Sequence, residues 1–458
     1  MLFNFNTKAL RTLRNTKKNL VKLIALSVLV LNLSSQAQTP DYYSTDNHLR
    51  YEDYEYMPNI KTVMLHHDLG DPNSTNDQLS DEVISMKTSD RLLLSFDDMD
   101  GGTKDFSYTF IHCDSHWQPS DINFFDVVKG YTEDRIRDYR SSYNTYQLFT
   151  HYSLSFPNES IRPIKSGNYI IKVYQDGDQD KLVLTRRFMI VDRKVTIKAE
   201  INQPTSIKER FRQQHIDFKV IYSNNMTYGL NDELNVVIRQ NGRWDNALTD
   251  IKPTFQQDQV LDFYYQEGNV FNGSNEFRWF DTRTIKTRTE RTERLIKDST
   301  TNIYTADLYG DPNRAKQRYS SESDLNGKYF IHTQDGTDSD LECDYTYVHF
   351  SLPYDSPQTN GNFYIFGGLT DWRINNKSLL TYNFDEKAYE CTLYLKQGYY
   401  NYEYVFLEDK APVADDTYIE GSHYETENDY TIYVYEKPMG SRIDMLIGIM
   451  KFNSIKKF

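Results

Sequence analysis

The sequence contains few of the residues and motifs from which catalytic or metal sites are recognised. Only three of its 458 residues are cysteines, and no two of them form a CxxC pair. This excludes the common structural-zinc and thioredoxin-like arrangements. GxSxG, P-loop and other phosphate-binding glycine motifs are also absent from the sequence. We therefore predict no catalytic residue, no metal site and no cofactor, and we expect no small-molecule substrate.

The three cysteines, Cys113, Cys343 and Cys391, each lie in or beside a strand-like run. An odd number permits one disulfide and leaves one thiol over, whereas placement within strands favours buried, unpaired thiols. If a pair forms, Cys343 and Cys391 are the expected partners, because both fall in the same predicted domain. The residues alone leave the two alternatives open.

Long apolar runs are also scarce. The run LIALSVLVLNL at residues 23–33 is shorter than the about 20 residues that a membrane-spanning helix needs. It follows a basic segment without acidic residues and precedes a small-x-small cleavage site, Ser35-Gln36-Ala37. We predict a signal peptide over residues 1–37, with an uncleaved anchor as the alternative. The mature chain is then exported and not inserted directly into the membrane.

Positive charge is under-represented as well. The formal net charge is −14, and loss of the signal peptide removes six basic residues and no acidic one, which leaves −20. A chain of this charge repels phosphate backbones, so nucleic acid is not an expected partner. The simplest meaning of the charge is solubility outside the cytoplasm.

Alternation of apolar and polar residues with period two is the dominant pattern. Aromatic residues make up 14% of the chain, with 37 tyrosines, and tyrosine fits a half-buried strand because its hydroxyl reaches water. Only residues 122–139 favour a helix. The pattern predicts an all-β fold of tandem immunoglobulin-like β-sandwich domains. The alternating runs lie at residues 167–175, 181–191, 215–222, 234–240, 346–352, 362–367, 389–395, 400–406 and 430–436, and residues 442–450 favour a further buried strand.

Composition divides the mature chain into three predicted domains. An N-terminal β-sandwich is expected at 38–192, and a second β-sandwich at 193–331. A C-terminal immunoglobulin-like sandwich is expected at 332–450. The polar segment 332–342 is interpreted as the linker between the last two. The charged segment 284–301 lacks an apolar face and is interpreted as a solvated strand edge or long hairpin.

The strongest candidate for chemistry is the cluster His112, Asp114 and His116. On a strand these three side chains share one face, which is the arrangement a metal-dependent enzyme would use. No HExxH or similar spacing supports such a site, and Asp114 begins a sequence typical of a turn. We favour a structural role at a strand end and retain the enzyme as an alternative hypothesis.

Two acidic segments have a weak likeness to calcium loops. These are FDDMDGG at residues 96–102 and YQDGDQD at residues 174–180. Neither has the spaced glutamate of an EF-hand loop. Turns that connect strands are the expected interpretation of both.

The C-terminal module resembles glycogen-binding modules with an immunoglobulin-like fold. The likeness rests on Gly367/Gly368 followed by Trp372, and on LKQGYYNY at residues 395–402. Trp372 is the candidate for stacking on a sugar ring, but no second tryptophan completes a platform. Loss of sugar binding with retention of the fold is therefore favoured. A periplasmic carbohydrate-binding protein that acts through this module is the alternative function.

Strings spread over most of the mature chain resemble the plug protein family of the type IX secretion system of Bacteroidetes, long known only as a domain of unknown function. No single string specifies a mechanism, but their order and number make the resemblance specific. They include IKTVMLHH (60–67), YTFIHCDSHWQPSDI (108–122), SYNTYQLFTHYSLSFPN (142–158), IRQNGRWDNA (238–247), NEFRWFDTR (275–283), LKQGYYNYEYVF (395–406) and GSHYETENDYTIYVYE (421–436).

The resemblance implies a non-enzymatic periplasmic protein, peripheral to the outer membrane. Its partner would be the giant outer-membrane β-barrel translocon (SprA/Sov type), whose periplasmic mouth it would close when no substrate is passing. Exposed aromatic residues are the expected contacts, since they are enriched at interfaces. Trp117, Trp244 and Trp279 are the candidate interface residues.

Overall fold

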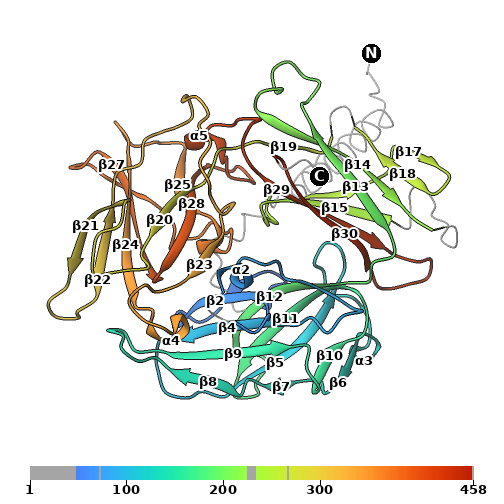
Figure 1. The fold of residues 1–458 in the computed structure, drawn as a ribbon, viewed down its shortest axis with the longest axis horizontal. Coiled ribbons are helices and arrows are strands. Elements are labelled where there is room, and N and C mark those ends of the chain that lie inside the picture. The colour runs from blue at the N-terminus through green and yellow to red at the C-terminus, as the bar shows by residue number, and fades with distance from the viewer. Residues whose placement is uncertain (1–47, 72–73, 224–233, 266–267, 456–458) are drawn as a thin grey trace, which may run out of the picture. The chain divides into compact units, whose positions relative to one another are not determined.

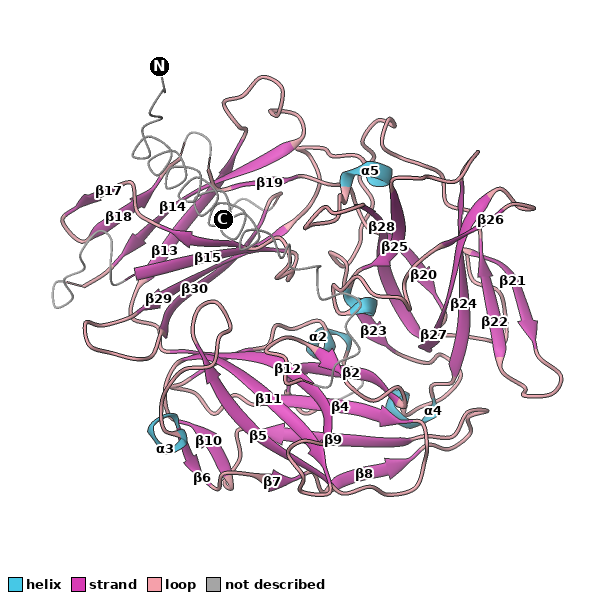
Figure 2. Ribbon diagram, turned by 180° about the vertical axis from the view of Figure 1, so that it is seen from behind, coloured by secondary structure: helices cyan, strands magenta, loops and turns pink. Residues whose placement is uncertain are grey.

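The computed structural model describes residues 48–71, 74–223, 234–265 and 268–455 (Figure 1). The predicted signal peptide lies outside them. Strands dominate this part of the chain, and its helices are single short turns between strands (Figure 2). No helix among the described residues has the length and apolarity that a membrane span requires. The predicted all-β fold is therefore confirmed.

The first sandwich packs two antiparallel sheets around an aromatic core. One sheet has the order β1-β12-β11-β5-β7 with β3 beside β12, and the other has the order β2-β4-β9-β8; β6 and β10 form a separate pair. Phe96, Tyr152 and Phe188 are among the fully buried rings between the sheets. Its elements are β1 (Tyr54–Glu55), β2 (Ile60–His67), α2 (Thr75–Gln78), β3 (Val83–Ser85), β4 (Leu92–Asp98), β5 (Phe106–Cys113), α3 (Phe124–Val127), β6 (Val128–Gly130), β7 (Asp134–Arg135), β8 (Asp138–Ser141), β9 (Thr150–Phe156), β10 (Ile161–Pro163), β11 (Gly167–Gln175) and β12 (Leu182–Val191).

The second sandwich takes its strands from two separate parts of the chain. Its sheets have the orders β13-β14-β18-β17, with β19 beside β14, and β16-β15-β29-β30. Strand β15 pairs with β29 in a register that sets Val236 opposite Val434 and so places both in the core. Its strands are β13 (Thr196–Asn202), β14 (Gln213–Ile221), β15 (Leu234–Gln240), β16 (Leu248–Ile251), β17 (Phe255–Gln257), β18 (Val260–Phe263), β19 (Val270–Asn272), β29 (Asp429–Glu436) and β30 (Met445–Asn453).

The third sandwich lies between β19 and β29 in the sequence and is therefore an insertion into the second. One sheet has the order β21-β22-β24-β27-β26, and the other is built on β28, which pairs with β20, β23 and β25. Phe280, Phe350 and Tyr402 lie in its core. Its elements are β20 (Arg278–Asp281), β21 (Thr292–Lys297), β22 (Tyr304–Leu308), β23 (Tyr329–Ile331), α4 (Ser339–Glu342), β24 (Tyr345–Pro353), β25 (Gly361–Phe366), η2 (Gly368–Thr370), β26 (Thr381–Asn383), β27 (Ala388–Lys396), β28 (Gly398–Glu408) and α5 (Thr417–Glu420).

Hydrogen-bonded pairing explains where sequence patterns succeed and where they fail. All nine alternating runs form strands, residues 442–450 contribute to β30, and the charged segment 284–301 contains the edge strand β21. The predicted boundary at 331/332 differs from the sheets, because β23 and β24 on either side of it share one core. Segment 332–342 accordingly lies within the third sandwich and is not a linker.

The helix expected at 122–139 is wrong. Only α3 is helical, and β6, β7 and β8 follow it. Strand β6 pairs with β10, and β8 pairs with β9, so tertiary pairing overrides local helix propensity. Gly130 ends β6 with φ of 113°, which is not a helical value, and a Cβ there would lie 2.0 Å from the Ser160 carbonyl oxygen, so no side chain fits at this position.

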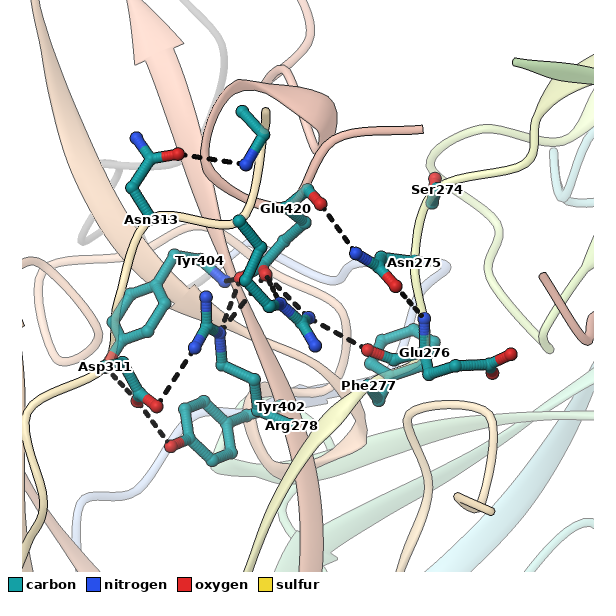
Figure 3. Close-up of polar contacts among 12 residues, drawn as sticks. Ser274, Asn275, Glu276, Phe277, Arg278, Asp311, Asn313, Tyr402, Tyr404 and Glu420 are labelled. Atoms are coloured by element: carbon teal, nitrogen blue, oxygen red, sulfur yellow. Dashed lines mark hydrogen bonds and ion pairs between the residues drawn. The ribbon is translucent and has the colours of Figure 1, made fainter. Parts of the chain in front are cut away.

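Buried charges hold together the two chain segments that enter and leave the third sandwich. Figure 3 shows Arg278 between Glu420 and Asp311, with Nε 3.0 Å from Glu420 Oε1 and Nη1 3.0 Å from Asp311 Oδ1. The hydroxyls of Tyr402 and Tyr404 also donate to Asp311. Burial opposes ionisation of Glu420, but Arg278 and Arg314 outweigh it and lower its pKa to about 2. The insertion therefore begins and ends at one ionic cluster.

We predict that Arg278→Met destabilises the protein by about 3–5 kcal/mol, because it leaves Glu420 and Asp311 buried without their cation. Arg135→Met is the control: Arg135 pairs with Asp105, and both side chains are exposed, so its loss is expected to cost less than about 1 kcal/mol. Urea unfolding of both variants measures the difference, and equal midpoints would contradict the structural role of this network.

Candidate functional site

Two of the predicted interface tryptophans lie in the seam between the first and second sandwiches. Trp117 is buried, and its ring meets Trp244 edge-to-face at 5.1 Å. The guanidinium carbon of Arg187 lies 4.8 Å from the Trp117 ring centre, and that of Arg239 lies 4.3 Å from the Trp244 ring centre. Such cation–π contacts stabilise most where water is excluded. Trp117 and Trp244 therefore make internal contacts in this structure.

The rest of this seam is largely apolar. Strands of the first sandwich contribute residues such as Ile170 and Met189, and strands of the second contribute Val237, Tyr435 and Leu446. Strand β11 is consequently buried on both faces. Tyr435 donates a hydrogen bond from its hydroxyl to Asn168 Oδ1 across the seam. The first two sandwiches thus share a continuous core cluster.

Trp279 lies elsewhere, on β20 of the third sandwich, and is half-buried. Its ring stacks on Tyr399 at 5.6 Å, and Tyr399 stacks on Phe330 at 5.7 Å. The guanidinium of Arg283 lies over the last two rings. Trp279 remains partly accessible at the end of this row of aromatic rings. Of the three predicted interface tryptophans, Trp279 alone lies outside the seam between the first and second sandwiches.

Trp372, the candidate for sugar stacking, is half-buried and packs against two aromatic rings and a guanidinium group. Its ring lies 5.8 Å from Phe277 and 5.4 Å from Phe366, and Arg243 lies over it. A Cβ at Gly327 would approach Trp372 Cη2 to 2.1 Å, so Gly327 is needed for this contact. The indole therefore packs the loop after β25 against Phe277, just before β20, and against Arg243 of the second sandwich.

The histidine cluster does not converge. Strand β5 ends at Cys113, so only His112 is on the strand, and its Nδ1 lies 2.8 Å from Ser120 Oγ. Asp114 accepts hydrogen bonds from the amides of His116 and Gln118 and so closes a turn. His116 instead bonds Asp250 of the second sandwich at 3.0 Å. No group of three or more metal-ligating side chains is found in the part of the chain that the structure describes.

We predict that His112 makes stability dependent on pH. Burial lowers its pKa to about 4, whereas the unfolded chain binds a proton near pH 6.5. Stability is therefore lost as pH falls from about 6.5 to 4, by roughly 2–3 kcal/mol. Urea unfolding between pH 4 and 7.5 should show a flatter profile for His112→Gln than for the unmodified protein. Parallel profiles would contradict this assignment.

The remaining candidate motifs have structural explanations. All three cysteines are buried free thiols, and burial raises the pKa of Cys391 to about 12, which makes it a poor nucleophile. In the acidic segment 96–102, the ammonium group of Lys104 lies 2.8 Å from Asp98 and 2.7 Å from Asp100. In this calcium-like segment the positive charge beside the two carboxylates is thus that of Lys104.

Sequence patterns did not reveal the seam between the first and third sandwiches. At its centre Asp97 of β4 meets Lys396 of β27 at 2.7 Å, and both side chains are 1% exposed. His151 and the Tyr345 hydroxyl also bond Asp97. Burial opposes the charge of Asp97, but Lys396 and His151 lower its pKa. Each residue belongs to a separate strand, so only the folded chain brings these charges together.

A second ionic contact joins all three sandwiches. Asp81, in the loop after α2, lies 3.0 Å from Lys328 of the third sandwich and 3.1 Å from Lys451 of the second. The two ammonium groups outweigh burial and hold the pKa of Asp81 far below its usual value. Nearby, Arg186 of β12 pairs with Asp371, which follows η2. Charged pairs thus fix the third sandwich against the other two.

An exposed aromatic surface adjoins the seam between the first and third sandwiches. The ring of Tyr347 of β24 packs against that of Tyr394 of β27, tilted, at 4.6 Å, and the loop between β8 and β9 brings Tyr146 to 5.9 Å from Tyr304. Lys297 lies over Tyr146. Tyr146 and Tyr347 are 48% and 42% exposed. We call this set the tyrosine surface; it has two neighbouring parts, because the strand register places Ile296, Tyr347 and Tyr394 on one face of the sheet and Tyr304, with Tyr146 against it, on the other.

Comparison with known proteins identifies relatives of this architecture. Residues 60–192, which run from the start of β2 to the end of β12, match the family model for the type 9 secretion system plug protein 1st domain. No curated protein matches the chain. A hypothetical protein from Parabacteroides merdae, solved by crystallography at 2.30 Å, is 30% identical. The similarity covers 89% of this chain and 100% of that chain, with a TM-score of 0.83.

The family match covers the first sandwich, and the structural match extends the relationship over all three. The family match agrees with the resemblance that the sequence strings carry. The chain belongs to the type IX secretion system plug protein family.

Proposed function

We propose that the protein is a reversible, non-enzymatic plug that binds the periplasmic mouth of the outer-membrane β-barrel translocon of the type IX secretion system. Family membership supports a role in type IX secretion. The observation that carries the finer proposal is the combination of buried polar seams with an exposed aromatic surface. A protein of this kind offers a partner a fixed shape and a large contact area. The candidate histidines, His112 and His116, bond Ser120 and Asp250, and the cysteines are buried.

Rigidity is what a seal requires of a protein that closes a pore. The first two sandwiches share an apolar cluster, and Asp81 ties the third sandwich to both. Buried ion pairs add little net stability, but they favour one arrangement over others. These contacts support a single defined docking shape in the absence of a partner.

The tyrosine surface is the face we assign to docking on the translocon. Tyrosine is enriched at protein interfaces, because it brings a large contact area with few rotatable bonds. Lys297 beside Tyr146 adds one cation to a chain whose overall charge is strongly negative. Trp279, stacked on Tyr399, is a further candidate contact on the same sandwich.

The direct test is recovery of the translocon with C-terminally tagged protein from gently solubilised envelopes. We expect the unmodified protein to retain the giant barrel protein, and Tyr347→Glu with Tyr146→Glu to reduce its recovery at least tenfold, because both carboxylates would be buried at the contact. The control is Tyr264→Glu, a charge at an exposed tyrosine on the second sandwich, which should leave recovery unchanged.

Each of the other outcomes has a definite meaning. Equal recovery of the translocon by the tyrosine variants and the control would reject the tyrosine surface but retain the plug. Recovery of no barrel protein by the unmodified chain would reject the plug. If glycan is recovered instead, and Trp372→Ala abolishes it, the carbohydrate-binding alternative replaces the proposal. The packing of Trp372 against Phe277, Phe366 and Gly327 does not favour that last result.

A further inference from the structure

The loop between β13 and β14 contains a compact turn that projects from one end of the second sandwich (Figure 1). Within it the Arg210 amide donates to the Ser206 carbonyl oxygen at 3.0 Å, and the Gln213 amide donates to the Glu209 carbonyl oxygen at 2.9 Å. Both bonds join residues four apart, as in a helix. Residues 206–213, which we call the basic turn, therefore present their side chains with helical spacing.

The base of the basic turn is fixed to the rest of the protein. The Tyr424 amide donates to the Phe211 carbonyl oxygen at 2.9 Å, and the Gly273 amide donates to the Arg212 carbonyl oxygen at 2.8 Å. The Ser422 hydroxyl also donates to the Arg212 carbonyl oxygen. These bonds hold the backbone of the turn, and the side chains of Phe211 and Arg212 take no part in them.

Two large apolar side chains of the basic turn face solvent. Ile207 is 80% exposed and Phe211 is 61% exposed. Because they are four residues apart in a helical turn, they lie on the same face. Neither side chain belongs to a core cluster of the described residues. An apolar pair that packs on no core indicates a contact surface.

Three exposed cations, Lys208, Arg210 and Arg212, alternate with this apolar pair along the turn. Lys208 and Arg212 are also four residues apart, so they share a face beside it. Among the described residues none of the three cations forms an ion pair, although Glu209 lies within the turn. The net charge of the chain without its predicted signal peptide is −20. The turn therefore combines basic and apolar side chains at one exposed point of an acidic protein.

An anionic lipid surface matches both properties of the basic turn. Basic side chains attract lipid phosphates, while apolar side chains enter the boundary between headgroups and acyl chains. A stable protein partner instead requires about 800 Å² of fitted surface on each side, which is more than the few side chains of one turn provide. A bilayer requires no complementary shape. Nucleic acid presents phosphates without an apolar layer, and the acidic remainder of the chain repels it.

We propose that the basic turn rests on an anionic lipid bilayer, with Ile207 and Phe211 at the base of the headgroups and the three cations on the phosphates. No strand enters the bilayer. The contact is weak by itself, because each cation near the surface strengthens binding only about fivefold. It orients a protein that other contacts hold in place. The inference goes beyond the proposed plug function and does not depend on it, since it requires lipid and no translocon.

Cosedimentation with lipid vesicles tests the proposal, with a chain of residues 38–458 that includes every described residue. Vesicles of equal parts phosphatidylglycerol and phosphatidylethanolamine are compared with vesicles of phosphatidylcholine. We expect partitioning onto the anionic vesicles to be stronger by about tenfold or more. Lys208→Gln with Arg212→Gln should lower it by about tenfold or more, and Phe211→Ser should lower it by about threefold or more.

Matched controls are available on the third sandwich. Phe384, in the turn between β26 and β27, is also exposed, but Asp385 and Glu386 follow it. Phe384→Ser should therefore leave partitioning unchanged. Lys387→Gln with Lys410→Gln removes the same charge from two exposed positions and should change partitioning by less than about twofold, because salt screens distant charges. Every substitution is at an exposed side chain, and equal midpoints of urea unfolding would show that all variants are folded.

Three results would overturn the proposal. The first is equal binding to phosphatidylcholine vesicles, and the second is an equal loss of binding for the two pairs of lysine or arginine substitutions. The third is binding to soluble polyglutamate as tight as to vesicles, without any effect of Phe211→Ser, which would assign the turn to an acidic protein partner. Failure of the unmodified protein to recover the translocon, with vesicle binding intact, would reject the plug function alone.

Discussion

The pairing of β15 with β29 is the constraint on which the rest of the structure depends. It joins a strand from the middle of the chain to one near its end, with Ile238 opposite Ile432 and Val236 opposite Val434. The chain between β19 and β29 must therefore leave the second sandwich and return to it close to the point where it left. The third sandwich becomes an insertion, and its entry and exit segments need the buried Arg278–Glu420 pair to stay together. Topology, rather than local sequence, thus decides where the charges are buried.

This constraint also explains how much of the fold the sequence predicted. Strands such as β11 and β27 follow from period two, because alternation reports local burial. The boundary between the second and third sandwiches does not, since the partner of β15 lies far along the chain and leaves no local signal. The helix expected at 122–139 failed for the same reason: β6 and β8 are determined by the strands that they meet.

The candidate site was harder to predict than the fold. Asp97 and Lys396 look like ordinary strand charges, and only their 2.7 Å contact reveals a buried pair. Conversely, Trp117 and Trp244 look like interface residues and instead pack together inside a seam. An exposed ring and a buried ring share one sequence signature, because aromatic residues are favoured in both environments. Family resemblance therefore pointed to the function, while the residues alone did not identify the docking face.

Buried polar groups hold the three sandwiches of this protein in a defined arrangement, and aromatic side chains are exposed on its surface. That combination suits a component that seals a pore and then leaves it. Single-channel conductance of the purified translocon in a planar bilayer tests this claim most directly. The account predicts an open, conducting pore that closes when the protein is added from the periplasmic side and reopens when it is washed out. An unchanged conductance in the presence of bound protein would contradict it.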